Sequence, residues 1–257
     1  MSDGERGGVR MVIGRRSLLA GAGLGGVAML AARPGFAQGS GEGGEGGEGG
    51  ERGAMPGPSD AAQLLLALGL IEGHLTAGAA VRAEGETEIA MTHMKHPEDE
   101  IYSDLVPQLE AAGAEGFAAE LQALTAAVQD GGDVEAARDA AQAKIEAARD
   151  AADATQADRV RAIAALTRVA ADEYDIGIAA DGSISNLHEY QDAWGFIQVA
   201  NRMAERLEPG ETRDKVVAAL APTADVFPAI LPQGTVEGSA DVLYGAAARI
   251  DFAIPAT

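Results

Sequence analysis

The stretch SDAAQLLLALGLIEGHLTAGAAVRA, residues 59–83, decides the fold. It begins with Ser59 and Asp60, whose side chains favour the N-cap position of a helix. Large apolar residues then recur every three or four positions, and they include Leu64, Leu68, Ile71 and Leu75. This spacing places them on one helical face, so it predicts an α-helix that ends near Ala83, before Gly85.

Comparable patterns predict helices along the rest of the chain. The predicted segments are residues 86–96, 97–113, 117–130, 134–154, 160–178, 185–207 and 240–250. Aromatic residues make up only 4% of the sequence, and alanine is abundant, which favours close packing of helices over a β-sandwich. We therefore predict an all-α fold, an antiparallel helical bundle spanning residues 59–257.

Two of these helices carry specific expectations. Pro97 is followed by three acidic residues, a pattern typical of a new helix start. The segment 134–154 contains only Val134 and Ile145 as large apolar residues, which predicts a solvated or edge helix.

The first 37 residues are typical of an export signal. The arginine pair stands in Arg15-Arg16-Ser17-Leu18-Leu19, and the apolar run that follows reaches residue 32, which is short for a membrane-spanning helix. The small residues Gly35 and Ala37 then provide a site for cleavage by signal peptidase. This segment resembles a twin-arginine (Tat) signal peptide, although Gly14 and Ala20 depart from the full consensus around the pair. The resemblance implies export to the periplasm and cleavage before Gln38, leaving a protein outside the membrane; an uncleaved anchor is the alternative.

Residues 39–57 are mostly glycine and glutamate, so we expect a disordered acidic linker over residues 38–58. The whole chain has a formal net charge of -21, which disfavours binding to nucleic acid. It contains no cysteine, which excludes disulfides and thiolate metal sites. No phosphate-binding loop or serine elbow is present either, and we do not expect an enzyme.

Side chains that can bind metal ions are densest in MTHMKHPEDE, residues 91–100. His93 and His96 are three positions apart and share a helical face, while Met91 and Met94 lie on a neighbouring stripe. Histidine with methionine suits copper, whereas histidine with carboxylates suits zinc or iron. The alternative is that the methionines fill the core and the histidines are structural.

The other two histidines extend this set. His74 lies roughly ten residues before the turn near residue 84 and His93 roughly eight after it, so antiparallel helices would bring them to similar heights. His188 has Asp192 at i+4, which is compatible with a metal pair or with a simple hydrogen bond.

Export, helicity and acidic character together resemble the imelysin-like periplasmic proteins. The motif Gly-x-His-x-x-Glu of that group is not met, because Ala77 stands where its glutamate belongs. No function is therefore carried over from it.

The sequence predicts an exported periplasmic protein that binds a transition metal, copper or iron, for storage, delivery or sensing. Its expected partners are the metal ion and a periplasmic protein. The predicted ligands are His74, His93, His96 and His188, joined by Met91 or Met94 if the ion is copper. Two alternatives stay open: a cofactor-free helical interaction module, and a protein that binds haem non-covalently through histidine and methionine.

The export prediction has a direct test. Changing Arg15→Lys together with Arg16→Lys should leave the precursor in the cytoplasm, because the Tat route recognises the arginine pair. Cell fractionation measures the location, and N-terminal sequencing of the exported wild type should begin at or near Gln38. Export of the double variant in a strain without the Tat translocase would contradict the prediction.

Overall fold

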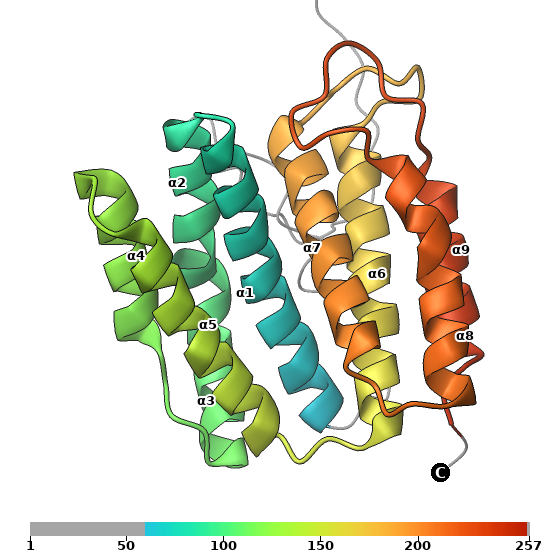
Figure 1. Cartoon of the computed structure of the whole chain (residues 1–257), viewed down its shortest axis with the longest axis horizontal. Helices are drawn as coiled ribbons and strands as arrows, with labels where there is room; N and C mark the ends of the chain where they lie inside the picture. The colour runs from blue at the N-terminus through green and yellow to red at the C-terminus, as the bar shows by residue number, and fades with distance from the viewer. Residues whose placement is uncertain (1–59, 256–257) are drawn as a thin grey trace, which may run out of the picture. The chain divides into compact units, whose positions relative to one another are not determined.

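A computed structural model describes residues 60–255, except for the side chain of Asp99 (Figure 1). The predicted signal peptide (1–37) and linker (38–58) lie outside the described residues. The helices are α1 (Asp60–Ala83), α2 (Thr87–His96), α3 (Tyr102–Ala112), α4 (Ala118–Asp130), α5 (Val134–Ala151), α6 (Gln156–Gly177), α7 (Leu187–Glu205), α8 (Glu211–Leu220) and α9 (Ala240–Asp251). A π-helical turn, η1 (Pro97–Ile101), follows α2, and a 3-10 segment, η2 (Ala221–Val226), follows α8. The all-α helical bundle is therefore confirmed for this part of the chain.

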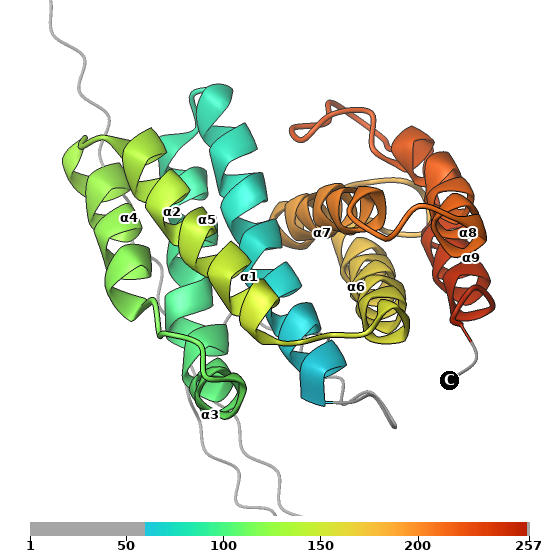
Figure 2. The same ribbon diagram turned by 60° about the horizontal axis from the view of Figure 1, so that its bottom comes forward.

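Helix α1 lies in the middle of the bundle, between α2 to α5 on one side and α6 to α9 on the other (Figures 1 and 2). Its Leu65 and Leu70 join the apolar cluster that α6, α7, α8 and α9 form. Its Leu68 and Ile71 join a second cluster, formed with α2, α3, α4 and α5. A helix that faces two cores must be apolar nearly all round, as the sequence of α1 is.

The apolar character of α1 also meets the criteria for a membrane-spanning helix. Its most apolar 18-residue window has a mean hydropathy of 1.7, and 72% of that window is buried inside the bundle. The same helix carries Glu72 and His74, both buried. This burial is what a central core helix of a bundle requires.

The structure corrects the prediction of a new helix start at Pro97. The backbone of His96 is helical, with φ -49° and ψ -47°, and α2 continues through the π-helical turn η1 into α3. Pro97 has no N–H to donate, and a widened turn accommodates that loss without ending the helix. The acidic residues after the proline therefore do not mark the start of a separate helix here.

Helix α5 exposes one face to solvent, but it is not simply solvated. It buries Ala141, Ile145 and Ala148 against the second cluster. Its Arg149 is also buried and pairs with Glu72 of α1, whose carboxylate accepts hydrogen bonds from Arg202 of α7 at 2.9 and 3.1 Å. A buried carboxylate held by two guanidinium groups joins α5, α1 and α7.

Glycines bring α1 and α7 into backbone contact. A Cβ atom added at Gly195 would collide with the carbonyl oxygen of Gly73, and one added at Gly73 would collide with the ring of Phe196. The two helices can be this close only because neither residue has a side chain. This contact sets the spacing between α1 and α7.

We predict that Gly195→Ala lowers the free energy of unfolding by about 1–3 kcal/mol, because the added methyl group meets backbone that cannot rotate away. Gly245→Ala in α9 is the matched control. Its Cβ would meet only the flexible side chain of Arg249, so the better helix propensity of alanine should stabilise the protein by up to about 1 kcal/mol. Urea denaturation measures both, and equal effects of the two substitutions would contradict this role of Gly195.

Candidate metal centre

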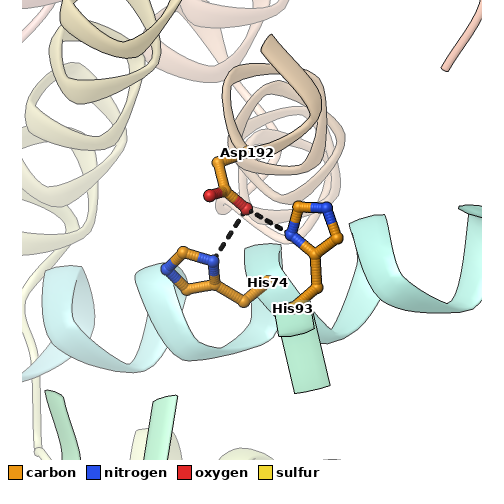
Figure 3. A group of neighbouring side chains, drawn as sticks. All are labelled: His74, His93 and Asp192. Carbon is orange, nitrogen blue, oxygen red and sulfur yellow. Dashed lines mark hydrogen bonds and ion pairs between the residues drawn. The ribbon is translucent and has the colours of Figure 1, made fainter. Parts of the chain in front are cut away.

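The carboxylate of Asp192 lies at the centre of a buried polar cluster (Figure 3). Its Oδ1 atom is 2.8 Å from Nδ1 of His74 and 2.9 Å from Nδ1 of His93. The exposed fractions of His74, His93 and Asp192 are 0%, 0% and 1%. One carboxylate oxygen therefore faces two imidazole nitrogens in an environment from which water is excluded.

Three helices deliver these side chains. His74 comes from α1 and His93 from α2, which are joined by a short turn at residues 84–86, and Asp192 comes from α7. His74 and His93 lie close together across that turn, since the ligand atoms of His74, His93 and Asp192 are within 4.8 Å of one another. Near the start of α7, Oδ1 of the N-cap residue Asn186 accepts a hydrogen bond of 3.1 Å from the N–H of His188.

Gln191 constrains His93 from its other side. Nε2 of His93 is 2.8 Å from Oε1 of Gln191, whose amide nitrogen donates to the carbonyl oxygen of Ile230 at 3.4 Å. This orientation requires Nε2 of His93 to carry the proton that it donates to Gln191. Nδ1 of His93 and Oδ1 of Asp192 are both electron-rich, so a proton or a metal ion must lie between them.

His188 and His96 complete the cluster, so all four histidines of the chain lie together. The ring of His188 stacks on that of His93, with centroids 4.2 Å apart and planes 9° from parallel. Nε2 of His188 is 3.1 Å from Oδ2 of Asp192. The ring of His96 lies 4.7 Å from that of His74 and 5.8 Å from that of His188, measured between centroids.

Asp192 is ionised although it is completely buried. Burial alone would raise the pKa of Asp192, but the charges of His74 and His93 and their hydrogen bonds outweigh it and hold the pKa well below its ordinary value. Burial, together with the charges of the other three histidines, lowers the pKa of His188 to about 4, against the opposing effect of Asp192. At neutral pH, Asp192 is ionised and His188 is neutral, the states in which each binds a metal.

The geometry of the inner group fits a metal ion. One ligand atom each from His74, His93 and Asp192 lie within 4.8 Å of one another. Two imidazoles and a carboxylate form a set that zinc and iron favour. The hydrogen bond from His93 to Gln191 is of the kind that orients a metal-binding histidine through its second nitrogen.

The two methionines pack with the apolar core. Met94 is completely buried in the second cluster, close to Gly78 of α1, and Met91 packs against the same cluster. Their packing accounts for both residues, and their role as copper ligands stays a prediction. Asp192 and Gln191 were not among the predicted ligands. For Asp192, its position four residues after His188 was the feature of the sequence that could have indicated a role in the site.

We predict that acid weakens the fold through His188. The unfolded chain takes up a proton on this residue near pH 6.5, whereas the folded chain does so near pH 4, so stability present above pH 6.5 is lost as the pH falls through this window. His188→Gln removes this difference. The variant should therefore lose less free energy of unfolding than the wild type between pH 7 and pH 4.5, measured by urea denaturation; an equal loss would contradict the assignment.

Comparison with known proteins gives one family match. Residues 149–250 match the model of the iron permease-associated 4-helix bundle domain, a match that supports a helical bundle but not the resemblance to the imelysin-like proteins. No curated protein and no solved structure matches the chain. The matched residues cover less than half of the chain, from the end of α5 into α9. They include His188, Gln191 and Asp192, and this segment is thus similar to a helical domain associated with iron permeases.

Proposed function

We propose that this protein is exported to the periplasm and binds iron there, for storage, delivery or sensing. Its ligands are His74 and His93 from the α1–α2 hairpin and Asp192 from α7. His188 and His96 lie beside them. The proposed partner is a protein of an iron-transport system. It would receive the ion in a delivery role, or recognise the metal-bound form of this protein in a sensing role.

The observation that carries this proposal is the shared carboxylate oxygen. Two fully buried imidazole nitrogens face Oδ1 of Asp192 at 2.8 and 2.9 Å, and Asp192 is itself buried and ionised. An ionised carboxylate is costly to bury unless a cation compensates it. A metal ion supplies that charge and takes the place of the protons that lie between the ring nitrogens and the carboxylate.

Two observations favour iron over copper. The inner ligands are nitrogen and carboxylate oxygen, whereas the thioether of Met94 lies in the apolar core. The match to an iron permease-associated domain includes Asp192 and His188. Hydrogen bonds from both inner imidazoles to a single carboxylate oxygen also favour a small ion over haem.

Asp192→Asn tests the proposal, because it keeps the size of the side chain and removes its charge. Wild-type protein should bind Fe(II) in anaerobic calorimetry, and free iron at 100 times Kd should raise the free energy of unfolding by about 2.7 kcal/mol. The affinity of the variant for Fe(II) should be lower by roughly 100-fold or more. Loss of a group that only hydrogen-bonds to a metal ligand already costs about 10–100-fold, and Asp192 is itself a proposed ligand. Asp172→Asn is the matched control, since this carboxylate bonds to Tyr244 outside the cluster.

Copper is distinguished in the same titrations. Met94→Leu should leave iron affinity unchanged, whereas a drop in Cu(I) affinity would assign the thioether to a copper site. If wild-type protein binds neither Fe(II), Zn(II), Cu(I) nor Cu(II), the metal proposal fails. The histidines then form a structural hydrogen-bond network of a cofactor-free interaction module, and Asp192→Asn lowers stability whether or not metal is present.

A further inference from the structure

We infer that the cluster holds two metal ions, in an inner and an outer position bridged by Asp192. The inner position is formed by His74, His93 and Oδ1 of Asp192. The outer position is formed by His188 and Oδ2 of Asp192, with His96 beside it. This inference rests on the proposed function, since it divides the same cluster into two sites.

The stacking of His93 and His188 excludes a single ion shared by both rings. An imidazole binds a metal through a lone pair that lies in the ring plane, at about 2.0–2.1 Å from the nitrogen. The two rings are 9° from parallel and stacked with centroids 4.2 Å apart. An ion in the plane of His93 therefore lies far out of the plane of His188, so each ring directs its lone pair to a different position.

The two oxygens of Asp192 divide in the same way. Oδ1 faces Nδ1 of His74 and Nδ1 of His93, while Oδ2 faces Nε2 of His188 at 3.1 Å. A carboxylate that offers one oxygen to each ion is a bridge. Ions in two-metal sites lie about 3.5–4 Å apart, a separation that one bridging carboxylate can span.

Access to solvent distinguishes the two positions. His74 and His93 are completely buried, whereas the side chain of His188 is 24% exposed. His96 is half-buried, and its ring is near both the ring of His74 and the ring of His188. An ion from solvent therefore meets the outer position first, and the bridging carboxylate connects it to the inner one.

The number of ions bound by purified mature protein tests this division. Anaerobic titration with Fe(II) should give two equivalents for the wild type and one for His188→Gln, which retains the inner ligands. Asp192→Asn should lose both. Far-UV circular dichroism and the melting temperature without metal verify that each variant is folded.

Electron paramagnetic resonance with Mn(II) tests whether the two ions are neighbours. Two Mn(II) ions joined by one carboxylate are magnetically coupled, so the second equivalent should weaken the six-line signal of the isolated ion. In His188→Gln the uncoupled signal should persist.

The outcomes separate this inference from the proposed function. One equivalent in the wild type, or two equivalents without coupling, overturns the two-position arrangement and leaves metal binding in place. Two equivalents that survive His188→Gln also overturn it. Failure of the wild type to bind any ion overturns both.

Discussion

The contact between Gly73 and Gly195 is the constraint on which the cluster depends. It brings the backbones of α1 and α7 together, because a Cβ atom at Gly195 would overlap the carbonyl oxygen of Gly73. His74 follows Gly73 directly, and Asp192 lies three positions before Gly195, on the same face of α7. The hydrogen bond of 2.8 Å between His74 and Asp192 is therefore a consequence of how closely two helices can pack.

Pairing with groups on other helices explains why α1 can carry charged side chains deep in the bundle. The helix contributes leucines to both apolar clusters, yet it carries a carboxylate and an imidazole at the level of the site. Glu72 is neutralised by Arg149 and Arg202, and His74 pairs with Asp192. Each buried polar group of α1 thus has a partner on a different helix, and these pairings specify which helices can pack against α1.

Periodicity was sufficient to predict most of the fold, and counting residues from a turn indicated that His74 and His93 lie at similar heights on antiparallel helices. Those features depend on local geometry, which repeats along the chain. The hydrogen bond between His74 and Asp192 joins residues 118 positions apart, and no local pattern encodes that pairing. The prediction at Pro97 was wrong although it used a local rule. Proline followed by acidic residues predicted a helix start, but a π-helical turn accommodates the proline within a continuing helix.

The cluster lies across the boundary of the family match. The matched residues 149–250 supply Asp192, His188 and Gln191, while α1 and α2 supply His74, His93 and His96 from outside it. A helical domain restricted to the matched segment would keep Asp192 and His188 but would lack His74 and His93, which complete the group of three ligands. The case for a metal centre therefore rests on the α1–α2 hairpin and its packing against α7, and the family match contributes independently to the choice of iron.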